Sequence, residues 1–426
     1  MERNDPRYQA YVEILKEELI PAMGCTEPIA LAYAAAKARE VLGVLPDSVQ
    51  LQGSGSIIKN VKSVIVPNTG HLKGMEAAVA AGIIAGSAEK ELEVISEVSE
   101  EKKSAIRDYL QTVPITIEHT EQGHVFDIVV TERCGQDYAR VRIADYHTNI
   151  CRIEKNGTVL YEVPLLDETV QEDARADRSL LNMQDIWDFA ETADLRDVAD
   201  LLERQIRYNN AIAEEGLLGD YGANIGRVLL TTYGNDVSNR AKAKAAAGSD
   251  ARMNGCELPV IINSGSGNQG ITCSVPLIEY AKELHSGKEK LYRALIISNL
   301  VAIHEKTGIG TLSAYCGAVS AGAGAGAGIV YLCGDGYQAA IHTVVNALAI
   351  VSGIVCDGAK ASCAAKIASS VDAALLGYNM YKCNQEFKGG DGIVMKDIET
   401  TIKGIGRLGK DGMRQTNEEI IRLMMS

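Results

Sequence analysis

Cysteine is the most reactive residue type in this chain, and three of its ten cysteines fall where they could act together. Cys316 is followed forty residues later by Cys356, and Cys363 comes seven residues after that. On one continuous helix, residues seven apart lie two turns apart on the same face. Three converging thiolates could hold an iron-sulfur cluster, although free cysteine is also a common small buried residue. The spacing alone leaves both interpretations open.

A glycine-rich loop at 263–270, Asn-Ser-Gly-Ser-Gly-Asn-Gln-Gly, is the second candidate. It follows a short apolar strand at 258–262 and precedes a helical segment, an arrangement that points backbone N–H groups at an anion. The loop matches neither the P-loop nor the dinucleotide pattern, so it predicts a carboxylate or phosphate site and nothing narrower. The residues expected to bind the anion are Ser264, Gly265, Ser266, Gly267 and Asn268.

Two shorter segments, at 53–56 and 67–70, have the same character in a weaker form. In the second, Asn68 and Thr69 are candidate contacts for a substrate. Ordinary turns explain such sequences equally well, because these residue types favour turn conformations for local reasons.

The pentapeptide Gly-Cys-Thr-Glu-Pro at 24–28 places Cys25 near the start of a helix. A first helix is expected over 8–20, where apolar residues recur at helical spacing, and an alanine-rich second helix follows the pentapeptide. Thr26 is the expected cap of that second helix. A thiol at a helix N-terminus lies at the positive end of the helix dipole, so we expect the Cys25 thiolate to be favoured.

The elements that must position these residues divide the chain into three predicted parts, 1–90, 91–165 and 166–426. In the first part, which carries Cys25, short strands are expected at 49–52 and 61–66 and a helix at 74–86.

From 113 to 163, β-branched and polar residues alternate between turn signals such as Asn156-Gly157, which predicts a small antiparallel sheet. Beyond residue 167 helical periodicity dominates. We therefore predict an α+β fold, in which a mixed N-terminal part packs on an all-α C-terminal domain.

Composition narrows the possible partners. Fifty-six acidic and 42 basic side chains among 426 residues give a formal net charge of −14, which repels nucleic-acid phosphates and anionic lipid. Ten scattered cysteines, with no recognisable signal peptide, predict reduced thiols and a cytoplasmic protein. No nucleic-acid or membrane partner is expected.

Residues 337–356 carry no formal charge over a length close to that of a membrane span. Gln338, His342 and Asn346 interrupt the stretch and no Lys or Arg cluster flanks it, so we predict a buried helix. Just before it, glycine and alanine alternate over 322–328. The large apolar residues that follow argue against a flexible linker, which leaves a tight helix crossing or close packing around a cofactor.

Taken together, Gly-Cys-Thr-Glu-Pro, the 263–270 loop and Cys316 with Cys356-Asp-Gly-Ala-Lys-Ala-Ser-Cys363 resemble the L-cysteine desulfidase family over nearly the whole chain. That family is related to the α-chain of iron-sulfur L-serine dehydratases. The combined pattern is far more specific than any single element. One departure is the C-terminal Met-Met-Ser, which lacks the cysteine that some serine dehydratases carry at their extreme C-terminus, so regulation through such a tail is not expected.

The resemblance implies a 4Fe-4S cluster held by Cys316, Cys356 and Cys363, with Cys25 as the catalytic base. Three protein ligands leave one iron with an open position that can act as a Lewis acid. The implied reaction converts L-cysteine to hydrogen sulfide and an enamine that hydrolyses to pyruvate and ammonia. L-serine or L-threonine dehydration by the same mechanism is the alternative, because the sequence does not separate a thiol from a hydroxyl substrate.

Glu27 and His304 are candidate groups for proton transfer or ammonium binding. Glu27 lies two residues from Cys25, although a carboxylate in the first turn of a helix also has an ordinary structural role. His304 lies at the end of an apolar helix, where a histidine commonly stabilises the helix dipole. The remaining cysteines are expected to be structural thiols.

Two other classes of function compete with this reading. A pyridoxal-phosphate β-eliminating enzyme could hold its cofactor's phosphate in the glycine-rich loop, but no lysine stands out as a Schiff-base residue. A non-catalytic sensor could use the same loops to bind a small L-amino acid. The sequence does not fix the oligomeric state, and a homodimer is compatible with it.

Overall fold

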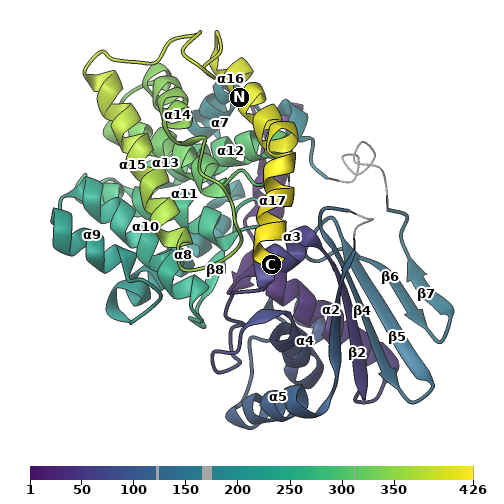
Figure 1. Cartoon of the computed structure of the whole chain (residues 1–426). Helices are drawn as coiled ribbons and strands as arrows, with labels where there is room; N and C mark the ends of the chain where they lie inside the picture. The colour runs from purple at the N-terminus through teal and green to yellow at the C-terminus, as the bar shows by residue number, and fades with distance from the viewer. Residues whose placement is uncertain (121–123, 166–174, 311, 426) are drawn as a thin grey trace.

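The computed structural model of the chain describes residues 1–120, 124–165, 175–310 and 312–425. A helical part and a sheet part lie side by side (Figure 1), and one hydrophobic core continues through both. The architecture is α+β, as the sequence predicts.

Six strands form one sheet in the order β3-β2-β4-β5-β6-β7. β2 pairs in parallel with β3, whereas the other neighbouring strands are antiparallel. The predicted sheet was purely antiparallel, whereas the observed sheet is mixed. The difference arises from β2, which comes from the first 90 residues and lies between β3 and β4. The strands are β2 (Ser48–Ser54), β3 (Ile115–Thr120), β4 (Asp127–Cys134), β5 (Asp137–Ala144), β6 (Ile150–Lys155) and β7 (Thr158–Glu162).

The strand predicted at 61–66 is wrong. The chain passes from β2 directly into a short helix, α3 (Gly55–Val61), and then turns. Within 61–66, all of which the structure describes, Ile65 alone forms a β-bridge, to Lys73. The valines that gave the segment its strand-like pattern are buried at a helix end and in a turn.

The predicted helices of the N-terminal part are confirmed. α2 covers the sheet at β4 and β5 and also packs on α4, so the helix that follows Cys25 lies between the sheet and a second helix. The elements of this part outside the sheet are α1 (Pro6–Glu18), β1 (Pro21–Met23), α2 (Thr26–Leu42), α3, α4 (Gly74–Ala85), η1 (Ala88–Glu93) and α5 (Glu100–Thr112).

The chain from residue 178 onward is almost entirely helical in the part that the structure describes. α13 lies in its middle, packed against α11, α12, α14 and α15. The elements are η3 (Arg178–Leu180), α7 (Met183–Thr192), η4 (Leu195–Asp197), α8 (Ala199–Leu218), α9 (Ile225–Tyr233), α10 (Val237–Met253), β8 (Pro259–Ile261), α11 (Gly267–Glu283), α12 (Lys288–Ile309), α13 (Gly317–Cys333), α14 (Tyr337–Val351), α15 (Cys363–Lys382), α16 (Ile398–Arg407), η5 (Leu408–Gly412) and α17 (Arg414–Met425).

The glycine-alanine run lies inside α13 and forms tight helix crossings. A β-carbon at Gly324 would lie 2.4 Å from the Ser298 carbonyl oxygen of α12. A β-carbon at Gly322 would lie 2.8 Å from backbone atoms of Ser370 in α15. These glycines therefore let three helix backbones approach closely, which supports the crossing interpretation of the run.

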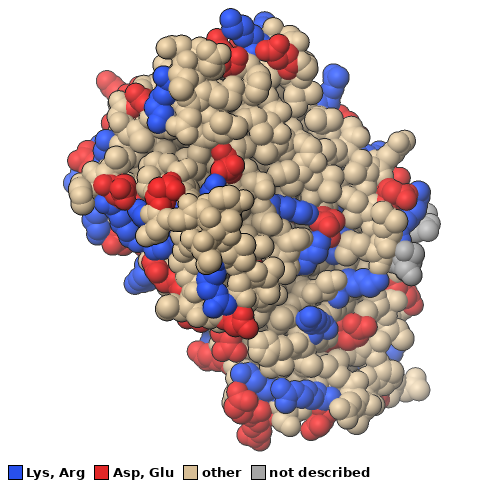
Figure 2. Space-filling model, turned by 60° about the vertical axis from the view of Figure 1, so that its left-hand side comes forward, with Lys and Arg blue, Asp and Glu red and all other residues tan. Residues whose placement is uncertain are grey.

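The uncharged stretch at 337–356 contains α14, which has 15 residues. No helix within the described ranges is both long and apolar enough to cross a membrane. On the face shown in Figure 2, acidic and basic side chains are interspersed over the described residues and form no continuous basic surface.

Two connections bring the parts of the chain together. β1 pairs antiparallel with β8, so the segment before Cys25 lies beside the segment before the glycine-rich loop. At the other end of the chain, α17 returns from the helical part and packs on α3 (Figure 1). Elements that are distant in sequence thus place the segments that carry candidate site residues close to one another.

Candidate active site

Cys25 is the N-cap residue of α2, so the helix begins directly after the thiol. The cap is Cys25 itself and not Thr26, which is the first helical residue. Cys25 Sγ donates a hydrogen bond to Glu27 Oε2 at 3.0 Å, and Cys25 is only 2% exposed. Gly24 permits this close packing, because its φ is +57° and a β-carbon there would lie 2.7 Å from Pro67.

The electrostatics of the pair place the proton on sulfur. Burial raises the pKa of Cys25 well above that of a free thiol, and the Glu27 carboxylate raises it further. This direction is opposite to the one expected from the helix dipole, because desolvation and a nearby negative charge outweigh it. Burial would also raise the pKa of Glu27, but His147, the Cys25 hydrogen bond and Arg252 together lower it. Glu27 is therefore ionised and placed to accept the thiol proton.

Further hydrogen bonds orient the Glu27 carboxylate. Asn60 Nδ2 of α3 donates to Glu27 Oε1 at 2.9 Å. Thr26 Oγ1 lies 3.2 Å from Glu27 Oε2, so its single proton can go either to this oxygen or to the glycine-rich loop. Because both carboxylate oxygens are engaged, the oxygen that faces Cys25 has a fixed position.

The predicted anion-binding loop lies directly against the start of α2. Thr26 Oγ1 donates to the Gly265 carbonyl at 3.0 Å. Ser264 and Gly265 have φ values of +49° and +75°, and the loop enters α11 after Ser266, whose side chain makes no cap hydrogen bond. The first N–H groups of α11 therefore have no side-chain cap, as an anion site requires.

The first turn of α11, which follows this loop, reaches the helix that follows Cys316. The Gln269 amide lies against Gly317, where a β-carbon would be 2.6 Å from it, and Gly317 is the first residue of α13. The side-chain oxygens of Asn268 and Gln269 are buried without a hydrogen-bond partner among the described residues. Because buried polar atoms are normally satisfied, these oxygens mark a position for a ligand or for water.

Two residues that the sequence does not single out, His147 and Arg252, complete the surroundings of Cys25 and Glu27. His147 comes from the β5–β6 connection, and its ring would lie 3.2 Å from a β-carbon at Gly265. Burial lowers the pKa of His147, against the opposing effect of Glu27. Arg252 comes from the last turn of α10 and is buried. No motif or periodicity marks either residue, because each reaches the site from another part of the fold.

Cys316 and Cys356 are brought together by a short antiparallel contact. The Cys316 N–H donates to the carbonyl of residue 354 at 3.1 Å, and the Cys356 N–H donates to the carbonyl of residue 314 at 2.6 Å. The two cysteines are therefore diagonal neighbours on one face of this contact, a relation that typically separates residues by about 7–8 Å.

Cys363 joins them as the first residue of α15, where its Sγ donates to the Gly358 carbonyl at 3.6 Å. Burial raises the pKa of Cys316 to about 12, and the charges of Cys356 and Cys363 act in the same direction. The three thiols are therefore near enough for their charges to act on one another, although they do not share one helix, and a common cluster site stays a prediction. Cys356 precedes α15 and lies outside any helix, because a turn separates it from Cys363.

Two lysines flank the three cysteines. Lys59 Nζ of α3 donates to the Cys356 carbonyl at 3.3 Å and to Asn417 Oδ1 at 2.6 Å, and burial lowers its pKa. Burial lowers the pKa of Lys306, on α12, to about 8, although Cys356 and Cys316 oppose this effect. A negatively charged group bound by three thiolates would meet compensating positive charge here.

The other predicted site residues have structural partners. Asn68 Nδ2 and Thr69 Oγ1 each donate to a backbone carbonyl of nearby loops at 2.7 Å. His304 Nε2 forms a 2.8 Å hydrogen bond with Glu399 Oε2, which joins α12 to α16. The contacts of Asn68 and Thr69 match ordinary loop roles, whereas His304 joins two helices and does not cap the end of α12. A substrate role for the three residues stays a prediction.

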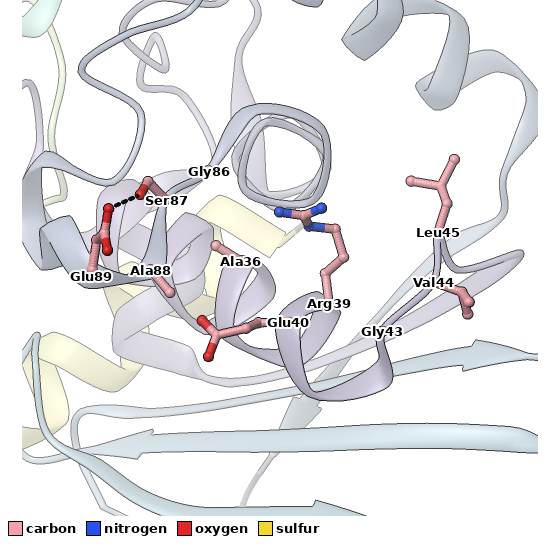
Figure 3. A pocket seen from close by; sticks show the side chains of 10 residues that line it. All are labelled: Ala36, Arg39, Glu40, Gly43, Val44, Leu45, Gly86, Ser87, Ala88 and Glu89. Atoms are coloured by element: carbon pink, nitrogen blue, oxygen red, sulfur yellow. Dashed lines mark hydrogen bonds between the residues drawn. The ribbon is translucent and has the colours of Figure 1, made fainter.

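Among the described residues, no group of three or more His, Cys, Asp or Glu side chains is arranged to hold a metal ion. A cluster distributes its ligands over several iron atoms, so its cysteines need not meet at one point. A surface hollow of about 530 Å³ lies elsewhere, at the C-terminal end of α2, where Arg39 and Glu40 help to line it (Figure 3). None of the predicted site residues lines this hollow.

Comparison with known proteins gives a consistent family. Residues 89–422, which include the 263–270 loop and the three cysteines, match the sequence model of the family described as serine dehydratase alpha chain. The whole chain is 61% identical to a UPF0597 protein of Desulfitobacterium hafniense, of which it covers 99%. Over 98% of its length it is 52% identical to a UPF0597 protein of Lachnoclostridium phytofermentans, all of which is covered. A UPF0597 protein of Treponema denticola is 46% identical over the full length of both chains.

Proposed function

The chain belongs to the serine dehydratase alpha-chain family, and on this premise we propose that it is an iron-sulfur-dependent lyase acting on L-cysteine. The observation that carries the proposal is a connection through α3. Asn60 of this helix donates to Glu27 at 2.9 Å, and the adjacent Lys59 donates to the Cys356 carbonyl at 3.3 Å. One short helix therefore joins the Cys25–Glu27 pair to the three cysteines.

The three cysteines fit a 4Fe-4S cluster in the chemistry of their donor atoms. Cys316, Cys356 and Cys363 offer soft thiol ligands at positions fixed by backbone hydrogen bonds and helix starts. When bound, the cluster would supply an iron with an open position, which acts as a Lewis acid toward the substrate. The same open position makes sensitivity to oxygen an expected property of the loaded protein.

Cys25 and Glu27 would move the protons of a β-elimination. The Cys25 proton passes to Glu27 Oε2, with which it already shares a 3.0 Å hydrogen bond. The thiolate takes the Cα proton of the substrate while the Cβ–S bond breaks. The departing hydrosulfide takes the proton from Glu27 and leaves as H₂S, which restores the resting pair. The remaining aminoacrylate hydrolyses to pyruvate and ammonia.

Dehydration of L-serine is the second candidate, because the family is described by that activity. The same proton transfers would then expel water instead of hydrogen sulfide. The ten free cysteines fit the cytoplasmic location that we propose for either reaction.

The proposal is tested by assaying anaerobically reconstituted protein with L-cysteine and L-serine in parallel. We expect pyruvate and sulfide in equal amounts from L-cysteine, with a larger kcat/KM than for L-serine. A larger kcat/KM for L-serine would favour the second candidate. Protein with a full complement of iron that forms pyruvate from neither amino acid would contradict both.

A further inference from the structure

Arg252 is a buried cation whose guanidinium is not held by a hydrogen bond or ion pair within the described part of the chain. It is 2% exposed, its Nε is fully buried, and it makes no hydrogen bond or ion pair with any residue that the structure describes. Lys59 is equally buried, yet its ammonium group is satisfied by Asn417 and the Cys356 carbonyl. A buried N–H of a charged group without an acceptor is costly, so the unpaired Nε of Arg252 indicates a position for an anion.

The surroundings of Arg252 place that anion at the start of α11. A β-carbon at Gly267 would lie 2.3 Å from Arg252 Nε and 2.8 Å from its Cζ, so the guanidinium lies directly against the first residue of this helix. α11 has 17 residues and no side-chain cap at Ser266. Its free N–H groups and the guanidinium therefore present donors to the same space, and glycine at 267 leaves the room for it.

The charges nearby identify the kind of anion. Arg252 acts electrostatically on Cys25, Glu27 and His147, so it belongs to the neighbourhood of the proposed base. The Glu27 carboxylate would repel a phosphate dianion but would attract an ammonium group. A site with a guanidinium on one side and a carboxylate on the other suits the zwitterion of a small amino acid.

We infer that Arg252 binds the α-carboxylate of the amino-acid substrate against the N-terminus of α11, and that it is a specificity-determining residue for α-amino acids. The inference rests on the proposed function and adds to it the group that holds the substrate's non-reacting end. Amino acids that lack a free carboxylate would then lose most of their affinity.

The test uses two non-reacting probes, L-alanine and L-alaninamide, which share the ammonium group and differ in the carboxylate. Titration calorimetry on anaerobically reconstituted protein should show L-alanine binding about tenfold or more tightly than L-alaninamide, as expected for a charge-assisted hydrogen-bond pair. Arg252→Gln should bind the two probes alike. Arg240→Gln is the matched control on the same helix, because Arg240 is already paired with Glu279 and Glu283, and it should discriminate like wild type.

Gly267→Ala supplies a second variant if Arg252→Gln does not fold, since its added carbon would displace the guanidinium without removing the charge. It too should lose the preference for L-alanine. Wild-type protein that binds both probes alike, or an Arg252→Gln or Gly267→Ala variant that folds and keeps the preference, would overturn the inference. Discrimination that depends on Arg252 in a protein that forms no pyruvate would uphold the inference and refute the lyase proposal alone.

Discussion

Cys25 and Cys316 have the same local position in the backbone but different electrostatic surroundings. Each is the N-cap residue of a helix of 17 residues, and burial raises the pKa of each thiol. Cys25 donates a hydrogen bond to the Glu27 carboxylate. Cys316 instead lies near other cysteines and interacts electrostatically with the positive charges of Lys306 and Lys366. A helix start therefore does not decide the role of a cysteine by itself. A carboxylate that accepts the proton suits a base, and cations suit thiolate ligands.

The strongest test of this difference removes the ligand side. Substituting Cys316, Cys356 or Cys363 by serine should remove most of the bound iron and, with it, turnover, because a hydroxyl is a poor replacement for a thiolate at iron. Iron per chain after anaerobic reconstitution is the measurement. Cys383→Ser is the control, since this free cysteine is exposed, and it should keep its iron. Near-complete iron in all three ligand variants would refute the assignment.

The next test removes the base and leaves the ligands. Cys25→Ser should keep its iron but lose turnover about 10²–10⁴-fold, the usual contribution of a general base. The serine hydroxyl is too weak an acid to give up its proton to Glu27. Pyruvate formation and iron content are measured on the same samples. An active Cys25→Ser variant would mean that another group takes the Cα proton.

A smaller change removes the charge beside Cys25. In Glu27→Gln the thiol must ionise without its acceptor, so turnover should fall about 10²-fold, at the lower end for a proton-transfer group. The wild-type rate should fall in acid as Glu27 becomes protonated. Because the pKa of Glu27 is lowered, this fall should occur at a pH below the usual range for a glutamate side chain. The variant should lose this acid limb, and its rate should rise with pH instead, because Cys25 itself must titrate. Identical profiles of kcat/KM against pH would show that Glu27 does not serve Cys25.

The smallest expected effect tests the cations on the ligand side. Lys59→Met removes the ammonium group that bonds the Cys356 carbonyl, and we expect the cluster to be bound about tenfold less tightly, as for other groups that support metal ligands. The rate of iron loss to a chelator under anaerobic conditions measures this. Lys242→Met, which removes an ion pair with Asp372 on α15, is the control. Equal rates in wild type and Lys59→Met would show that this charge does not matter.

The sequence predicted the parts of the site that depend on contiguous residues. The helix start at Cys25 and the turn at 263–266 follow from local signals, since a proline in the first helical turn and a glycine at positive φ shape the backbone nearby. The predicted loop was too long, because residues 267–270 already belong to α11. The strands between 113 and 163 were also predicted from a local signal, the alternation of β-branched and polar residues between turns. A common site for Cys316, Cys356 and Cys363 stays a prediction. The contact between residues 314–316 and 354–356, which brings Cys316 near Cys356, was not predicted because it leaves no periodic signal in the sequence.

The features that the sequence missed are set by long-range packing. β2 is a parallel neighbour of β3, and no local pattern reveals which strands pair. His147 and Arg252 reach the site from the β5–β6 connection and from α10, and neither belongs to a motif. The raised pKa of Cys25 was also missed, because the sequence shows the helix start but not the burial that outweighs it.

We propose that Cys25 is the catalytic base and that the three cysteines hold the cluster of the same active site. This proposal is tested most directly by measuring iron content and pyruvate formation from L-cysteine together on anaerobic samples of wild type, Cys25→Ser and Cys363→Ser. We expect iron with turnover in wild type, iron without turnover in Cys25→Ser, and little of either in Cys363→Ser. Loss of iron from Cys25→Ser equal to that from Cys363→Ser, or full iron and turnover in Cys363→Ser, would contradict it.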